Sequence, residues 1–539
     1  MRTVKDVTYG LLRQLGLTTI VGNPGSTEET FLKDFPDDFR YVLALQEASV
    51  VGIADGLSQG LRKPVIVNVH TAAGLGNAMG CLLTAYLNKT PLVVTAGQQT
   101  RDMMLLEPLL TNIDAVNMPR PWVKWSYEPA RAQDVPAAFM RAYATALQPP
   151  AGPVFLSLPL DDWDKEMPEA MVEGIAPRTV ASRVGPDPDR LAEFARRIEA
   201  SVRPVLVYGS DIARSQGWQA GIALAERLGA PVWTAPFAER TPFPETHRLH
   251  AGTLPAAIGP VEQRLAGHDL VVVVGAPVFR YYPFVAGRYL PPGVPLLQVT
   301  DDPEASAKAP VGDSLLSDSR LFLETLLPLI RSPTPRAAAT ALRPAAKPGN
   351  LESLPLSAAA AMSAVRRACP TDFVLVEESP SNVPEMQDIF RIDQPDSFYT
   401  FASGGLGWGM PAAVGLALAE RDSGRNRPVV VLMGDGSFQY SVQSLYSAVQ
   451  QKVKSVYVVF QNDEYAILKS FAELEKTPHV PGLDIPGIDI VSLARGYGAP
   501  AALARTADDA TAAVGEALKR PGTSVVVIPI TRRFHPLLG

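Results

Sequence analysis

The stretch Val429-Val-Val-Leu-Met-Gly-Asp-Gly-Ser437 places a Gly-Asp-Gly turn directly after a run of apolar, mainly β-branched residues. Such a run is typical of a buried strand in a parallel sheet, and we expect an amphipathic helix that begins near Tyr440 to follow it. Ligands bind at the carboxyl ends of strands in open α/β sheets, where glycines let backbone N–H groups approach a phosphate. The stretch therefore predicts a phosphate-binding turn, with the carboxylate of Asp435 available for a hard cation.

A second apolar run, Ser455-Val-Tyr-Val-Val-Phe460, ends in Gln461-Asn462-Asp463-Glu464. Asn462 follows Asp435 by 27 residues, which is the length of one helix and one strand, so we expect both turns at the same edge of a sheet. A carboxylate, an amide oxygen and a backbone carbonyl, completed by phosphate oxygens and water, suit Mg²⁺ or Ca²⁺. Two ordinary strand-to-helix turns without a ligand are the alternative.

Short β-branched runs recur along the whole chain, separated by segments of helical length. They are Thr19 to Val21, Pro64 to Val69, Leu92 to Ala96, Val154 to Leu158, Pro204 to Tyr208, Leu270 to Val274 and Ser524 to Ile528. This alternation predicts parallel sheets covered by helices. We predict three doubly wound α/β domains at residues 1–180, 181–335 and 350–539, with a Pro/Ala-rich linker at 336–349.

Composition excludes several classes of protein. With 47% apolar residues, 19% charged residues and a net charge of −6 over 539 residues, the chain is globular and lacks the basic surface of a nucleic-acid binder. It contains no uninterrupted apolar stretch long enough for a membrane helix and no signal-peptide pattern at its start, so we expect a cytoplasmic protein. Cys81 and Cys369 lack metal-ligand spacing and are expected in the core.

Glu47 is a candidate functional residue. The segment Leu43-Ala-Leu-Gln-Glu47-Ala-Ser-Val-Val-Gly52 puts it between a short strand and an Ala/Gly-rich helix. A carboxylate among apolar residues is expensive to bury unless it is paired, so we expect a raised pKa and a functional role. A simple negative charge at a helix start is the alternative.

The chain resembles the benzoylformate decarboxylase family of thiamin diphosphate-dependent 2-keto acid decarboxylases. Besides the Gly434-Asp-Gly-Ser437 and Gln461-Asn462 motifs, the resemblance rests on five segments in matching order and spacing. They are Gly22-Asn-Pro-Gly-Ser26, Leu45-Gln-Glu47-Ala48, Asn68-Val-His70-Thr-Ala-Ala-Gly74, Thr95-Ala-Gly-Gln-Gln-Thr100 and Trp122-Val-Lys-Trp125-Ser126. The resemblance implies a thiamin diphosphate-binding fold, in which a pyrimidine-binding domain and a diphosphate-binding domain flank a central Rossmann-like domain.

The resemblance also implies an activity, cofactors and an assembly. The activity is the non-oxidative decarboxylation of an aryl or branched 2-keto acid, such as benzoylformate, to an aldehyde and CO₂. The cofactors are thiamin diphosphate and Mg²⁺ or Ca²⁺. The family's cofactor lies between the amino-terminal domain of one subunit and the carboxy-terminal domain of another, which implies a homo-oligomer, commonly a dimer of dimers.

Three catalytic residues carry over from the family. Glu47 would be the carboxylate that activates the cofactor, His70 the acid/base beside the keto acid, and Ser26 the hydroxyl that holds the substrate carboxylate. These roles suit the residue types, because histidine changes protonation near neutral pH and a hydroxyl on a Pro-Gly turn can reach a ligand.

The cofactor and metal contacts carry over in the same way. The metal ligands would be Asp435, Asn462 and the carbonyl of Glu464. Gly404 would contact the aminopyrimidine, and Leu406 would be the apolar wedge that bends the cofactor. The other expected cofactor contacts are Ser381, Gly434, Gly436, Ser437 and Tyr465.

Two positions depart from the family and leave the reaction outcome open. Tyr282 stands where the family has a second catalytic histidine, and a phenol is a poor proton carrier at neutral pH. Slower protonation would favour a thiamin-dependent carboligase resembling acetolactate synthase, which is the main alternative; a non-catalytic cofactor-binding protein is another. In the expected substrate pocket of Tyr282, Ile467, Leu468 and Phe471, the β-branched Ile467 predicts a substrate smaller than benzoylformate or different in shape.

Overall fold

The computed structural model describes residues 2–331, 343–344, 346–532 and 537. It contains three parallel sheets, so the predicted α/β fold class is confirmed. The chain forms two compact units. The first unit combines Met1–Ala181, Gly349–Val383 and Ser403–His535, and the second combines Ser182–Pro348, Pro384–Ala402 and Pro536–Gly539. Residues 336–342 and 345 of the predicted linker lie outside the described residues.

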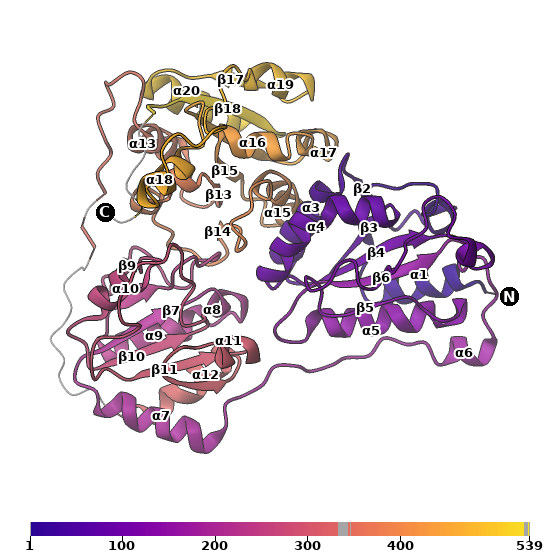
Figure 1. Cartoon of the computed structure of the whole chain (residues 1–539), viewed down its shortest axis with the longest axis horizontal. Helices are drawn as coiled ribbons and strands as arrows, with labels where there is room; N and C mark the ends of the chain where they lie inside the picture. The colour runs from indigo at the N-terminus through magenta and orange to yellow at the C-terminus, as the bar shows by residue number, and fades with distance from the viewer. Residues whose placement is uncertain (1, 332–342, 345, 533–536, 538–539) are drawn as a thin grey trace. The chain divides into compact units, whose positions relative to one another are not determined.

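The amino-terminal sheet has the strand order β2-β1-β3-β4-β6-β5 (Figure 1). Its strands are β1 (Thr19–Gly22), β2 (Arg40–Leu43), β3 (Val65–Val69), β4 (Leu92–Gln98), β5 (Ser126–Tyr127) and β6 (Val154–Pro159). Its helices are α1 (Val4–Gln14), α2 (Glu29–Leu32), α3 (Glu47–Leu61), α4 (Thr71–Leu87), α5 (Val135–Leu147) and α6 (Glu169–Glu173), with 3₁₀ turns η1 (Arg101–Leu106) and η2 (Ala132–Asp134). Helices α3 and α4 cover one face, and α1 and α5 cover the other.

The central sheet has the order β12-β11-β10-β7-β8-β9. Its strands are β7 (Pro204–Tyr208), β8 (Val232–Thr234), β9 (His250–Thr253), β10 (Leu270–Val274), β11 (Leu296–Thr300) and β12 (Asp313–Leu316). The helices of this unit are α7 (Pro188–Ala200), α8 (Asp211–Arg214), α9 (Trp218–Leu228), α10 (Ile258–Leu265), α11 (Pro303–Ala307) and α12 (Ser319–Leu326), with η3 (Leu327–Leu329); α14 (Val383–Ile389) and β14 (Phe398–Tyr399) follow later in the chain.

Alternate residues of the central strands enter two separate cores. Val272 and Val274 pack with α7, α9 and α12, whereas Val271 and Val273 pack with α10 on the opposite face. Because both faces are covered, every position of such a strand is apolar. This double burial explains the uninterrupted apolar runs that predicted the strands.

The carboxy-terminal sheet contains β13-β15-β16-β18-β17 in that order. These are β13 (Val374–Glu378), β15 (Val429–Gly434), β16 (Ser455–Gln461), β17 (Ala501–Leu503) and β18 (Ser524–Pro529). The helices are α13 (Ala358–Ala368), α15 (Gly409–Asp422), α16 (Asp435–Tyr440), α17 (Ser444–Gln450), α18 (Ala466–Leu474), α19 (Ile490–Gly496) and α20 (Ala507–Lys519), with η4 (Pro380–Asn382).

One predicted boundary is wrong. The helix after the Gly-Asp-Gly turn begins at Asp435, and Tyr440 is its last residue. Gly434 caps the helix with an extended backbone at φ −79° and ψ 160°, so the helix starts without an intervening loop. Ser441, at φ −148°, then separates α16 from α17.

The remaining sequence expectations concern membranes and cysteines. Among the described residues, none of the helices combines the length and the apolar character that a bilayer crossing requires. Cys81 and Cys369 are both buried and unbridged, which confirms their place in the core. Burial raises the pKa of the Cys369 thiol to about 12.

Helices α3 and α15 pack at backbone distance within the first unit. A Cβ atom added at Gly56 would lie 2.1 Å from the carbonyl oxygen of Ala412, and one added at Gly415 would lie 2.0 Å from that of Ile53. Neither backbone can move without moving its helix. The two helices therefore depend on glycine at both positions.

Replacing Gly56 with alanine tests this packing. We expect Gly56→Ala to lower the free energy of unfolding by at least about 2 kcal/mol, the order seen for overpacked buried sites. Gly10→Ala is the matched control, because Gly10 lies in α1 with no atom within 4 Å of the added Cβ. The control should be neutral or stabilise the protein by up to about 1 kcal/mol. Equal thermal midpoints for both variants at one heating rate would contradict the analysis.

Candidate active site

Glu47 is buried at the first turn of α3, with 6% of its surface exposed. Gln46 caps the helix, accepting hydrogen bonds from the backbone N–H groups of Ala48 and Ser49. The Glu47 carboxylate accepts one hydrogen bond on each oxygen, from Nδ2 of Asn23 and from Nδ2 of Asn77, both at 3.0 Å. Both hydrogen-bond donors are neutral side-chain amides.

His70 follows strand β3 and is the residue before α4. Its Nδ1 lies 2.8 Å from Oε2 of Glu28 and 3.4 Å from Oγ1 of Thr27. An ionised carboxylate can only accept, so Nδ1 donates this hydrogen bond and Nε2 is the nitrogen that faces other partners. Glu28 thus sets both the tautomer and the orientation of the ring.

Ser26 is exposed and lies on the turn that carries Glu28. The turn packs directly on the imidazole, since a Cβ atom added at Gly25 would lie 2.0 Å from Nδ1 of His70. Only glycine leaves room for the ring here. The structure therefore brings together the predicted residues Ser26 and His70.

Glu28 was not among the predicted site residues. It is 2% exposed and also accepts hydrogen bonds from the N–H groups of Gly25 (2.9 Å) and Gly97 (2.7 Å). In the sequence it stands beside Glu29, which is exposed, and nothing local separates the two glutamates. The distinguishing contacts come from β4 and from the residue after β3, distant positions that no local pattern identifies.

Asp435 and Asn462 meet at one sheet edge, as the spacing predicted. Strands β15 and β16 are parallel neighbours in which Gly434 pairs with Phe460. The Asp435 carboxylate accepts hydrogen bonds from the N–H groups of Gly436 (2.8 Å), Asn462 (3.0 Å) and Asp463 (2.6 Å). Burial raises the pKa of Asp435 to about 6, against the effect of these hydrogen bonds.

The donor set at this edge fits a hard divalent cation. A buried carboxylate with a raised pKa lacks a positive partner, and a cation would supply one. The side-chain oxygen of Asn462 is close by, accepting a hydrogen bond from the N–H of Glu464 at 3.3 Å. No cluster of three or more His, Cys, Asp or Glu side chains that could hold a metal ion occurs in the described part of the chain.

The Gly-Asp-Gly turn is tightly packed. A Cβ atom added at Gly436 would lie 2.5 Å from Cε1 of Tyr465, so that ring lies against the turn. Ser437 is buried in the first turn of α16. Burial and the neighbouring Tyr440 raise the pKa of Tyr465. Gly434, Gly436, Ser437 and Tyr465 thus form one cluster with Asp435.

Ser381 and the loop of Gly404 and Leu406 follow different elements of the same domain. Ser381 lies in η4 just after β13. Gly404 is exposed at φ +74°, a conformation that favours glycine, and no atom lies within 4 Å of an added Cβ. Leu406 is half-buried in the segment before α15.

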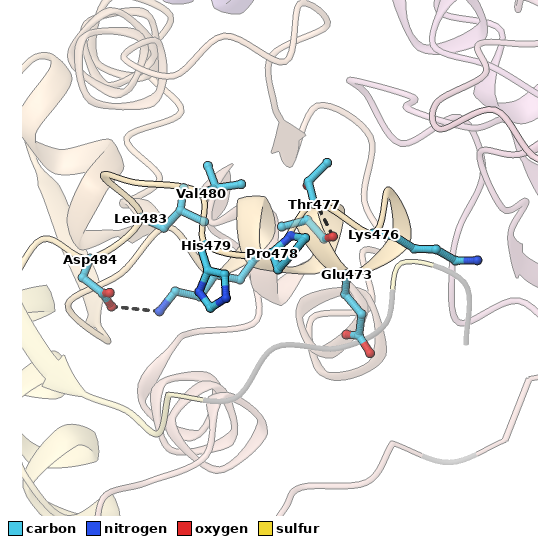
Figure 2. Close-up of a pocket in the computed structure, with 10 residues that line it drawn as sticks. Glu473, Lys476, Thr477, Pro478, His479, Val480, Leu483 and Asp484 are labelled. Carbon is cyan, nitrogen blue, oxygen red and sulfur yellow. Dashed lines mark hydrogen bonds and ion pairs between the residues drawn. The ribbon is translucent and has the colours of Figure 1, made fainter.

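The predicted substrate-pocket residues are divided between two units. Tyr282 belongs to the second unit and is 61% exposed. Ile467, Leu468 and Phe471 lie on α18 in the first unit. A cavity of about 600 Å³ opens on another face of α18, where Lys469 and Glu473 line it together with residues 476–480 (Figure 2). Lys469 there forms an ion pair with Glu464 and another with Asp484 at 2.8 Å.

The site residues form two clusters, an amino-terminal one with Glu47 and His70 and a carboxy-terminal one with Asp435. The hydrogen bonds of each cluster reach a separate part of the chain. Those of Glu47 and His70 reach residues between 23 and 77, and those of Asp435 reach residues between 436 and 463. One cluster offers a buried carboxylate and an oriented imidazole. The other offers a buried carboxylate beside an amide side chain, at a glycine-containing turn.

Comparison with known proteins places all three domains in one family. Residues 2–118, 191–326 and 381–528 match the N-terminal TPP binding domain, the central domain and the C-terminal TPP binding domain of thiamine pyrophosphate enzymes. Benzoylformate decarboxylase of Pseudomonas aeruginosa is 45% identical over 99% of this chain and 100% of its own. Acetolactate synthase large subunits of Escherichia coli are more distant, at 24% identity.

Solved structures that resemble this chain belong to the same family. Benzoylformate decarboxylase from Polynucleobacter necessarius is 65% identical with a TM-score of 0.97, covering 99% of this chain and 100% of that one. A thiamine diphosphate-dependent 4-hydroxybenzoylformate decarboxylase of Rhodococcus jostii RHA1 is 41% identical with a TM-score of 0.95, at the same coverage. The chain therefore belongs to the thiamine pyrophosphate enzymes, within the benzoylformate decarboxylase family.

Proposed function

We propose that this protein decarboxylates benzoylformate, or a ring-substituted relative, to the aromatic aldehyde and CO₂ with thiamin diphosphate and Mg²⁺. The observation that carries the proposal is the buried Glu47 carboxylate held by two neutral amides, in a chain of this family. A buried carboxylate held in place by neutral donors is positioned to accept a hydrogen bond from a ligand. The cofactor, when bound, supplies the electron sink that loss of CO₂ requires.

Each catalytic residue has a distinct task in this proposal. Glu47 would accept a hydrogen bond from the cofactor's aminopyrimidine, the contact through which the protein would activate the bound cofactor. The Ser26 hydroxyl donates a hydrogen bond to the substrate carboxylate. His70 moves a proton at the substrate's carbonyl oxygen through Nε2, while Glu28 holds Nδ1.

The carboxy-terminal cluster would hold the other end of the cofactor. Asp435, Asn462 and the carbonyl of Glu464 would bind Mg²⁺, or Ca²⁺ in its place, and the cation would supply positive charge for binding the diphosphate. Ser381, Gly434, Gly436, Ser437 and Tyr465 would surround the diphosphate, and Gly404 and Leu406 the aminopyrimidine end.

A second copy of the chain would complete the site. Among the described residues, the hydrogen bonds of Glu47 and those of Asp435 go to different partners, and the segment of η1 and the residues after it exposes apolar side chains. Leu105 is 93% exposed, and Leu106, Leu109 and Ile113 are between 64% and 85% exposed. Soluble proteins seldom leave such patches open to water, so this segment favours association into a homo-oligomer, a dimer of dimers by resemblance.

Carboligation is the second candidate, and Tyr282 is the residue that favours it. A phenol in place of a second histidine slows protonation, which gives a second aldehyde time to react. The distance of acetolactate synthases from this chain favours decarboxylation instead. The ratio of aldehyde to 2-hydroxy ketone separates the two reactions.

The activity test uses purified protein with thiamin diphosphate, Mg²⁺ and benzoylformate. We expect CO₂ and benzaldehyde, and we expect Glu47→Gln to lower kcat by at least about 100-fold, the contribution of an acid/base group. Glu29→Gln, an exposed glutamate nearby, is the matched control and should keep full activity. Bound cofactor without CO₂ release would refute the proposal. Comparing benzoylformate, 4-hydroxybenzoylformate and a branched aliphatic 2-keto acid tests the effect of Ile467 on the pocket.

The Glu28–His70 pair gives a second prediction. Glu28→Gln should reduce kcat by about 10- to 100-fold, part of what acid/base catalysis contributes, because the imidazole loses the partner that orients it. Affinity for the cofactor should stay unchanged, since Glu28 contacts His70 and the N–H groups of Gly25 and Gly97, which are not expected cofactor contacts. Steady-state kinetics and a cofactor titration measure both. A variant with wild-type kcat would show that Glu28 has no part in catalysis.

The metal site gives a third prediction. Asp435→Asn should weaken thiamin diphosphate binding in Mg²⁺ by more than about 100-fold, beyond the 10- to 100-fold typical of an outer-shell partner. Asp508→Asn, an exposed aspartate at the start of α20, is the control. Chelation should release cofactor from the wild-type protein, and added Mg²⁺ should restore binding. Tight binding in the presence of chelator would exclude the metal.

A further inference from the structure

Glu378 is a buried carboxylate that the proposed reaction does not use. It is the last residue of β13 and is 0% exposed. Oε1 accepts a hydrogen bond from the N–H of Gly407 at 2.6 Å, and Oε2 accepts one from the N–H of Gly409. A carboxylate at this depth is costly unless both oxygens are satisfied, and two backbone donors from one segment satisfy them.

The segment whose N–H groups donate to Glu378 runs from Gly404 and Leu406 into α15. Glu378 itself directly precedes the turn that carries Ser381. One side chain therefore joins the turn expected at the diphosphate to the loop expected at the aminopyrimidine. The span between these two turns must match the length of the cofactor.

The backbone of the loop is shaped to receive the carboxylate. Gly407 has φ +104°, which a residue with a Cβ atom rarely adopts. A Cβ atom added at Gly409 would lie 2.9 Å from Oε2 of Glu378. Burial raises the pKa of Glu378 to about 8, and the two N–H groups act in the opposite direction.

The residue between the two glycines is anchored from the other side. The indole Nε1 of Trp408 donates to Oδ2 of Asp55 at 2.6 Å, and both residues are fully buried. Asp55 lies on α3 and is itself held by Asn88 (3.0 Å) and Thr90 (2.6 Å). The loop is thus fixed on both sides, by Glu378 through its backbone and by Asp55 through a side chain.

We propose that Glu378 is a positioning residue that holds the loop of residues 403–409 in the shape that places Gly404 and Leu406 against the aminopyrimidine end of the cofactor. The inference rests on the proposed function, because it needs thiamin diphosphate as the ligand. Glu378 acts through the loop backbone and touches no reacting atom.

The binding affinities for thiamin diphosphate and for inorganic diphosphate test the inference. Glu378→Gln cannot accept two N–H donors equally, because one side-chain oxygen becomes an NH₂ group. We expect about tenfold weaker binding of thiamin diphosphate in Mg²⁺ and about tenfold lower kcat, the order of one hydrogen bond to a charged group. Affinity for inorganic diphosphate in Mg²⁺ should stay within about twofold, because the substitution leaves Asp435, Asn462 and Glu464 unchanged. Glu420→Gln is the matched control, a buried glutamate of α15 paired with Arg425 and Arg427; it should leave both affinities unchanged.

A double-mutant cycle shows whether Glu378 acts through Leu406. The loss of thiamin diphosphate affinity caused by Glu378→Gln should shrink in a Leu406→Ala background, since coupled residues are not additive. Additive losses, equal losses for both ligands, or no loss would each overturn the inference. If Glu378→Gln does not fold, Glu378→Asp takes its place with the same expectations. A wild-type protein that binds no thiamin diphosphate would overturn the proposed function, and the inference with it.

Discussion

Burying a carboxylate is costly unless its oxygens receive hydrogen bonds, and this protein buries Glu28, Glu47, Asp55, Glu378 and Asp435. Their partners are backbone N–H groups, amides, hydroxyls and one indole, together with the imidazole of His70. No arginine or lysine is among the partners described for these five side chains. Hydrogen bonds of this kind are directional, so they fix where each carboxylate points.

Other buried carboxylates have cationic partners, as Glu239 of the second unit shows. Glu239 forms ion pairs with Arg214 and, at 2.9 Å, with Arg280, and these cations hold its pKa well below its usual range. Such a group is neutralised within the protein and has little charge to offer a ligand. The contrast is between buried carboxylates held by neutral donors and buried carboxylates held by arginines.

The strands that the sequence predicted include β7 and β10, which are buried at every position and contain no charged or amide side chain. Strands β12 and β17 escaped prediction because most of their positions are open to water. Strands β11 and β13 were not predicted from the sequence for another reason. They are fully buried but contain Gln298 or the Glu377-Glu378 pair, and these polar residues interrupt the apolar run.

The site was predictable to the extent that it follows chain order. The contact between Asp435 and Asn462 was foreseen because the register of parallel strands converts a spacing along the chain into a distance. Glu28 was not foreseen, because its contact with Gly97 spans 69 residues and leaves no local pattern. The roles carried over from the family remain predictions, and the arrangement of Tyr282 relative to the other site residues does too.

The glycines of α3 bear on how the enzyme can be redesigned. Gly52 and Gly56 bring this helix against Pro411 and Ala412 with no side chain to absorb a shift, and Glu47 begins the same helix. A library that randomises α3 would thus lose folded protein before it gained new activity. Helix α18 has exposed and half-buried positions, among them Leu468 and Ile467, so directed evolution of substrate range has room there that the glycine-packed helix does not offer.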